Sequence, residues 1–233
     1  SLFEGGDEEE KTTKDLGYLV EWNEHEFLKN EKDVIGFYFS GHPLTNIAKE
    51  AKAFSKLNLK AIDGNYDKRE IQLVCLITGI KKLKTKKGKN MAFLTVEDLT
   101  DEREVIIFPK TFEEFESNIE KDKIVFLKAR VELKDEENVS IPAESIIGFD
   151  LAKEKMVKEC IIDINPMGLE QKNLIELKNF IDKNKGGSSV VLNLNSLHHG
   201  DVRVKIKQKI KINEEFEKYI RDNFGDEAIS YSL

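Results

Sequence analysis

Hydrophobic positions divide the chain into segments of different character. Residues 18–66 carry apolar side chains at the spacing of amphipathic helices. Residues 67–150 carry the alternating or continuous apolar runs that are typical of strands, and residues 151–233 mix both patterns. Residues 1–17 are acidic and poor in large apolar side chains, which predicts a flexible segment. The sequence therefore predicts four parts, with boundaries near residues 17, 66 and 150.

Within residues 67–150 the pattern predicts strands separated by one helix. Thr111–Ile119 fits that helix, with Thr111 as N-cap and Glu114 completing a capping box. The strands are expected over Ile71–Ile80, Met91–Asp98, Glu104–Phe108, Ile124–Leu133 and Val139–Ala143. Three strands, a helix and two further strands is the order of an OB-fold. We therefore expect an α+β protein built on a five-stranded OB-fold β-barrel, which a short helical segment precedes and a small α+β domain follows.

The last part of the chain is expected to form this small α+β domain. Glu154–Lys158 is predicted to be a linker, and Asn213 is placed to cap the final helix. Gly186 and Gly187 would end the helix before them. The remaining expected elements are a strand over Ile161–Ile164, a helix over Leu169–Ile181, and strands over Val190–Leu194 and Val202–Ile206.

The net charge changes meaning when it is divided along the chain. The sequence has 44 acidic and 37 basic residues and a net charge of −7, which at face value speaks against a nucleic-acid partner. Residues 1–33, however, hold 11 acids and four bases, so the other 200 residues are neutral. The acidity belongs to the leading segment, and it excludes no nucleic-acid site in the folded part.

Other sequence features narrow the class of protein. No apolar run approaches the ~20 residues of a membrane span, so we expect no membrane partner. Cys75 and Cys160 lie far apart without ligand spacing, which fits a reducing, cytoplasmic location. The first residues lack a methionine and a signal pattern, so we expect a piece of a longer protein. No phosphate-binding glycine loop and no His/Cys cluster occurs, so no catalytic residue, metal or cofactor is assigned to this chain.

The strongest local signal is basic. Residues 81–89 contain six lysines and no acid, namely Lys81, Lys82, Lys84, Lys86, Lys87 and Lys89. They join the first two expected strands, which is one of the two loops that OB-folds use to bind oligonucleotides. A solvated basic turn without a ligand is the alternative.

Aromatic residues follow this lysine-rich segment. Phe93 and Phe108 could lie beside it, where rings stack under bases while lysines bind phosphates, and either could equally belong to the core. With Arg103 and the six lysines, they form our predicted site for single-stranded DNA.

Three stretches carry a family resemblance. Gly36–Leu44, GFYFSGHPL, resembles the G-x-Y-x-S/T-G-H-P-L stretch of the bacterial DNA polymerase III alpha subunits. Lys86–Asp98, KKGKNMAFLTVED, and Glu104–Pro109, EVIIFP, resemble the start of the OB domain of that family. The resemblance runs in order over nearly the whole chain.

The resemblance implies a function. The parent would be a DNA-directed DNA polymerase that uses Mg²⁺ in domains upstream, so this fragment would hold no active site. Its OB domain would bind the single-stranded template, and its C-terminal domain would contact the clamp-loader tau subunit. Leu2 and Phe3 are similar to the end of the motif that binds the sliding clamp.

Two other functions remain open. The basic loop, Phe-Leu strand and acidic turn also occur in tRNA-binding OB modules of synthetases, and a preference for folded tRNA over single-stranded DNA would support that class. A stand-alone enzyme would reveal itself by turnover, although the sequence offers no catalytic constellation for one.

Overall fold

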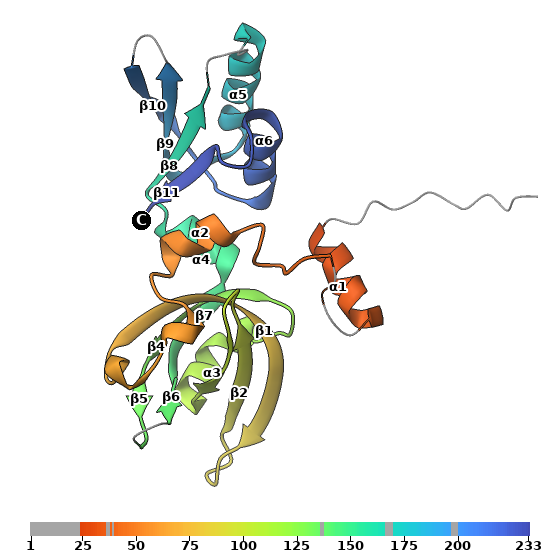
Figure 1. Cartoon of the computed structure of the whole chain (residues 1–233), viewed down its shortest axis with the longest axis vertical. Helices are drawn as coiled ribbons and strands as arrows, with labels where there is room; N and C mark the ends of the chain where they lie inside the picture. The colour runs from red at the N-terminus through yellow and green to blue at the C-terminus, as the bar shows by residue number, and fades with distance from the viewer. Residues whose placement is uncertain (1–23, 36–37, 39, 136–137, 166–169, 197–199) are drawn as a thin grey trace, which may run out of the picture. The chain divides into compact units, whose positions relative to one another are not determined.

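The computed structural model describes residues 24–35, 38, 40–135, 138–165, 170–196 and 200–233 (Figure 1). It divides into two compact units, which meet in the sequence between Gly41 and His42. In the first unit, helix α1 (Glu24–Ile35) is followed by Ser40, whose backbone N–H donates to Glu31 Oε2 over 2.9 Å. This boundary falls inside the predicted helical segment 18–66, and the four-part division stays a prediction. No helix of the described residues is long and apolar enough to cross a membrane.

A five-stranded antiparallel sheet forms the first part of the second unit, in the order β3-β2-β1-β4-β7. The strands are β1 (Glu70–Lys84), β2 (Asn90–Glu97), β3 (Glu102–Ile107), β4 (Ile124–Arg130) and β7 (Ala143–Gly148). The short strands β5 (Glu132–Leu133) and β6 (Val139–Ser140) pair as a separate ribbon between β4 and β7. This confirms the OB-fold. A parallel bridge between Ile106 and Pro142 links the two sides of the sheet, so the barrel is partly open and not a continuous ring of paired strands.

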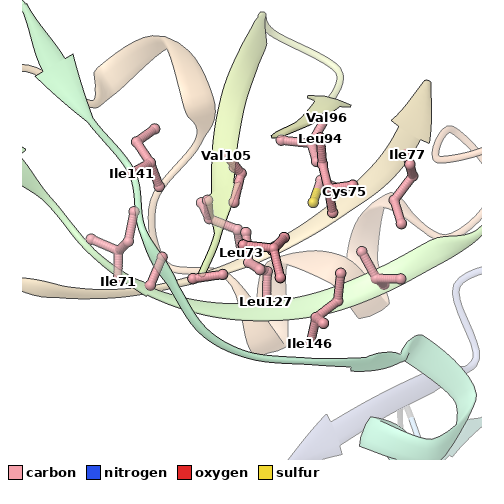
Figure 2. Close-up of a cluster of buried hydrophobic side chains, with 14 of the residues drawn as sticks. Ile71, Leu73, Cys75, Ile77, Leu94, Val96, Val105, Leu127, Ile141 and Ile146 are labelled. Atoms are coloured by element: carbon pink, nitrogen blue, oxygen red, sulfur yellow. The ribbon is translucent and has the colours of Figure 1, made fainter. Parts of the chain in front are cut away.

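The core of this sheet follows from strand alternation. In Figure 2, side chains from β1, β2 and β4 point toward one another, among them Leu73, Leu94 and Leu127. Cys75 is fully buried among them, and burial, reinforced by the charge of Asp98, raises the pKa of its thiol to about 12. Cys75 thus acts as a small hydrophobic residue of the core.

Helix α3 (Pro109–Phe115) begins earlier than predicted, so the expected capping box is wrong. Pro109 occupies the first helical turn, where its fixed φ and missing N–H cost nothing, and Phe108 precedes it without a side-chain cap. Thr111 is buried, and its Oγ1 donates to the backbone O of Ala143 over 3.1 Å. This bond ties the helix to β7 across the end of the sheet.

Short helices lead into the sheet. They are α2 (Ala48–Phe54) and the 3-10 helices η1 (Leu59–Ala61) and η2 (Gly64–Tyr66). The Phe54 ring packs edge-on against Phe126 and Phe149, with centroids 6.0 and 5.1 Å apart. Helix α2 is thereby fixed to β4 and to α4 (Phe149–Met156). The expected linker over Glu154–Lys158 is wrong in its first half, because residues 154–156 continue α4.

The rest of the second unit is an α+β domain with sheet order β10-β9-β8-β11. Helices α5 and α6 lie on one face of this sheet (Figure 1). Its elements are β8 (Glu159–Ile164), α5 (Gln171–Lys183), β9 (Lys185–Ser196), β10 (Gly200–Ile210), α6 (Glu214–Phe224) and β11 (Ile229–Ser232).

Three details of this domain test the sequence predictions. Asn213 caps α6 as expected, because its Oδ1 accepts from the Phe216 N–H over 2.9 Å. Gly186 and Gly187 do not end α5. They lie in β9, and Asn184 closes the helix through its N–H to Phe180 and Ile181 carbonyls.

Candidate nucleic-acid interface

The register of β1, β2 and β3 places a row of three side chains on the outer face of the sheet. Lys81 lies opposite Phe93, and Phe93 lies opposite Ile106. Directly opposed residues share a face of the sheet. Ala92 and Ile107 of the neighbouring row are fully buried, so the row of Phe93 points away from the core. Ile106, at the β3 end of the row of Phe93, is itself buried. Phe93 is half-buried within this outer surface.

A second outer row lies closer to the β1–β2 turn. Leu83 opposes Met91, and Leu83 is 40% exposed. Phe108 continues the outward parity of Ile106 past the end of β3 and is 47% exposed. Neither predicted phenylalanine therefore belongs to the buried core. The outer face thus presents the rings of Phe93 and Phe108 and the side chains of Leu83 and Met91 beside lysines.

The lysine-rich segment, residues 81–89, is called the lysine arm below. The sequence places all of it in a turn, but β1 runs to Lys84, so only residues 85–89 connect the strands. Strand β1 stays in register with β2 beyond an irregularity between Ile77 and Gly79. A Cβ at Gly79 would lie 2.8 Å from Thr95 Oγ1, so a side chain there would push the two strands apart. The prediction that all six lysines lie in the loop is therefore wrong, because Lys81, Lys82 and Lys84 belong to β1.

Two lysines of the arm are directed toward α3. Lys82 shares the inward parity of Ala92; its Nζ lies 5.5 Å from the Phe112 ring centroid and 3.6 Å from Glu116 Oε1. Lys89 Nζ lies 3.4 Å from Glu113 Oε1. Exposed pairs of this kind contribute about 0–1 kcal/mol, so they orient these lysines without neutralising them.

The other four lysines of the arm are exposed, and none forms an ion pair with any residue that the structure describes. They are Lys81, Lys84, Lys86 and Lys87. Gly88, with φ +77°, closes the turn between them, a backbone conformation that favours glycine. These four ammonium groups can exchange water and counterions for phosphate oxygens at no cost to the fold.

Arg103 is not brought to the row of Phe93. It opposes Val96, which is inward-facing, and its Nη2 lies 3.1 Å from Asp101 Oδ2. It lines a cavity of about 190 Å³ between β3 and the β5–β6 ribbon, where Lys134 and Ser140 also lie. The sequence analysis did not single out Lys134, because β5 and β6 pair outside the main sheet and strand alternation in β4 does not carry over to them.

Two other kinds of site bear on function, namely the predicted clamp-binding residues and possible metal ligands. Leu2 and Phe3, predicted to bind the sliding clamp, lie outside the described residues. Within the described ranges, no group of three or more His, Cys, Asp or Glu side chains is placed to hold a metal ion. Asp98, next to the β2–β3 turn, accepts from the N–H groups of Leu59 and Thr100, each over 2.7 Å.

Comparison with known proteins gives matches of two kinds. A family model described as an OB-fold nucleic acid binding domain (tRNA anti-codon) matches residues 71–147. A crystal structure of the mitochondrial single-stranded DNA binding protein from S. cerevisiae is 9% identical, with a TM-score of 0.31, and covers 35% of this chain and 94% of that one. A match at that score carries no argument about function.

Sequence relatives give the family. DNA polymerase III subunit alpha of Bacillus subtilis (strain 168) is 29% identical over 191 residues, which are 82% of this chain and 16% of the relative. The same subunit of Buchnera aphidicola is 30% identical over 69% of this chain and 14% of the relative. That of Escherichia coli (strain K12) is 22% identical over 78% of this chain and 16% of the relative. The chain thus spans about a sixth of the length of these curated relatives. It belongs to the bacterial DNA polymerase III alpha family and corresponds to the C-terminal, OB-fold-containing region of those subunits.

Proposed function

We propose that this chain binds single-stranded template DNA within a bacterial replicative DNA polymerase, through the outer face of β1, β2 and β3. The observation that carries the proposal is the pair of Lys81 and Phe93 on the outer face of the sheet, which places a ring directly beside a cation. Single-strand binders without sequence preference combine these two groups, because a ring stacks under any base while ammonium groups bind phosphates.

The position of the lysine arm suggests the path of the DNA strand across the sheet. The strand would enter at Lys84, Lys86 and Lys87 and cross the face over Phe93. Glu104 opposes Thr95 one row further on, and its exposed carboxylate repels phosphate there. The backbone is therefore expected to pass along the β1–β2 side of the face, away from Glu104.

The longer protein would be a DNA-directed DNA polymerase acting in DNA replication, as the names of the relatives indicate. Nucleotide transfer and its Mg²⁺ would belong to segments outside this chain. Here the chain would hold the template strand and contribute no catalytic group. The expected partners also include the sliding clamp, through Leu2 and Phe3, and the clamp-loader tau subunit, through residues 151–233.

A titration of labelled oligo-dT at two salt concentrations tests the DNA proposal. The triple variant K84A/K86A/K87A should weaken binding and lower the slope of log K against log salt by about 2, since each lost phosphate contact removes about 0.7. The matched control K121A/K155A/K218A removes the same charge from exposed positions outside the arm. An equal change in both variants would contradict the assignment, because it would reflect net charge alone.

Folded RNA is the second candidate ligand. The matching family model carries the name tRNA anti-codon, which is the observation in its favour. A competition between oligo-dT and a transfer RNA at fixed salt separates the two. Displacement of oligo-dT by tRNA at a much lower nucleotide concentration would favour the RNA function.

The clamp contact has its own test. Removal of residues 1–6 from the full chain should abolish binding to the bacterial sliding clamp and leave oligo-dT binding unchanged. Clamp binding that survives this deletion would show that Leu2 and Phe3 are not the contact.

A further inference from the structure

The C-terminal sheet ends in an edge strand with an alternating pattern. Strand β10 pairs with β9 on one side and has no strand partner on the other among the described strands. Basic and apolar residues alternate along it from Val202 to Lys207, and Gln208 takes the next apolar position before Lys209 and Ile210. The cations Arg203 and Lys205 share one face of the strand. Lys207 and Lys209 follow at the same spacing beyond Ile206, where the register with β9 becomes irregular, and all four cations are exposed. Arg203, Lys207 and Lys209 form no ion pair with a described residue.

The other face of β10 is apolar and incompletely covered. Val204 opposes Leu192, and Ile206 opposes the fully buried Val190, so this face lies on the helix-covered side of the sheet. Toward the β9–β10 turn, however, Val202 is 46% exposed and Val204 is 41% exposed. The edge therefore offers aliphatic side chains to solvent beside its free backbone groups.

A groove accompanies this edge. A cavity of about 410 Å³ lies between α5 and β10, lined by Lys178, Ile181, Asp182, Ile206, Lys207 and Gln208. Its aliphatic lining residues, Ile181 and Ile206, lie together with Lys178 and Lys207, and Asp182 is the acidic residue of the lining. A side chain arriving next to β10 on this face would enter the groove.

We propose that β10 is a docking edge for an extended peptide in which acidic and apolar residues alternate. The peptide would add as a further strand, with backbone hydrogen bonds along the free edge of β10. Its apolar side chains would cover Val202 and Val204 and enter the groove at Ile206. Its carboxylates would face Arg203, Lys207 and Lys209.

The chemistry favours a peptide over a nucleic acid. Strands β9 and β10 contain no aromatic residue, so this face lacks the rings on which a single strand stacks. Lysines on an edge also prevent uncontrolled pairing between sheets. That protective role explains the charges, but it explains neither the exposed valines nor the groove at Ile206.

The test uses the whole chain and a fluorescein-labelled peptide of alternating glutamate and valine, measured by fluorescence anisotropy. We expect saturable binding that the variant R203E/K207E weakens about tenfold or more, as does N-methylation of alternate peptide nitrogens, which blocks the ladder but keeps every side chain. The control K155E/K218E changes the same charge away from β10 and should bind normally. Should the double variant lose its cooperative thermal transition, K207E alone serves in its place.

Three results would overturn the inference. They are absence of peptide binding to the unmodified chain, equal binding of the N-methylated peptide, and a loss of oligo-dT binding in R203E/K207E as large as the loss of peptide binding. An equal loss of oligo-dT binding would indicate that the cations of β10 bind nucleic acid. No residue is shared with the proposed DNA face, so failure here leaves that proposal standing.

Discussion

Lysine serves opposite purposes in two regions of this chain. On the lysine arm, Lys84, Lys86 and Lys87 are exposed and form no ion pair with a described residue. In α4, Lys153 is 3% exposed, and its Nζ lies 2.8 Å from Glu217 Oε2 and 2.9 Å from Asp150 Oδ1. The first group can exchange solvent for a ligand, whereas the second is committed to the fold.

The buried lysine is the centre of a network between the OB-fold part and the C-terminal domain. Glu217 of α6 is itself buried and also accepts from the Tyr231 hydroxyl of β11. Beside it, Arg221 pairs with the buried Glu50 of α2. Burial by itself lowers the pKa of Lys153, but the charges of Glu217 and Asp150 outweigh it and raise the pKa. The raised pKa of Lys153 therefore depends on Glu217 and Asp150.

The largest expected effect comes from breaking this network. The substitution Lys153→Met should lower the free energy of unfolding by about 3–5 kcal/mol, because it leaves Glu217 buried without its counter-charge. Urea denaturation measures this, with the exposed Lys155→Met of the same helix as control. The double variant K153M/E217L should recover much of the loss; a loss as large as in K153M would show that packing, and not charge, is responsible.

Alkaline pH should lower the free energy of unfolding by less than Lys153→Met does, since every partner of Lys153 remains in place. The folded-state pKa of Lys153 is raised, so its contribution is full below its ordinary pKa and disappears as pH rises through the folded value. Burial also raises the pKa of Cys160 and of Tyr231, and both ionise more readily in the unfolded chain. The urea midpoint should therefore fall from about pH 9 upward, and the fall should be shallower in Y231F. An unchanged midpoint at pH 10 would contradict it.

The outer aromatic face should respond in binding and not in stability. Phe93→Ala is expected to cost about 1–3 kcal/mol of oligo-dT affinity if a base stacks on that ring. The matched control is Leu151→Ala, an exposed apolar residue of α4 outside the face. A collapsed thermal transition in F93A with unchanged affinity per folded molecule would assign Phe93 to packing instead.

The contrast between the two lysine regions also marks what sequence could predict. The order of strands and the α3 helix follow from apolar alternation, and the position of the lysine arm follows from that order. The facing of each lysine does not, because it depends on the irregularity between Ile77 and Gly79, which resets the parity of β1 against β2. The capping pattern predicts too late a start for α3, because the helix begins at Pro109 and the Thr111 hydroxyl bonds to Ala143, a partner distant in sequence.

Long-range partners explain the other errors as well. The local pattern does not indicate that Lys153 is buried, because its counter-charge, Glu217, lies 64 residues later in the sequence. The sequence predicts a linker over part of α4 because charged residues of the helix outnumber the apolar residues of its buried face. Strand β11, Ile229–Ser232, is too short and too polar for its pattern to show, and it forms because its register with β8 places Tyr231 opposite Cys160, close to Glu217.

The smallest expected effect is on the fold of the lysine arm itself. In K84A/K86A/K87A the free energy of unfolding should change by no more than about 0.5 kcal/mol, because no carboxylate among the described residues depends on these side chains. Urea denaturation of the variant used in the oligo-dT titration measures it on the same sample. A loss approaching that of K153M would mean that the arm packs against something essential to the fold, and the weaker DNA binding could then no longer be attributed to lost phosphate contacts. If K84A/K86A/K87A is as stable as the unmodified chain but has a reduced salt slope, the lysines of the arm serve binding, in contrast to Lys153, which serves the fold.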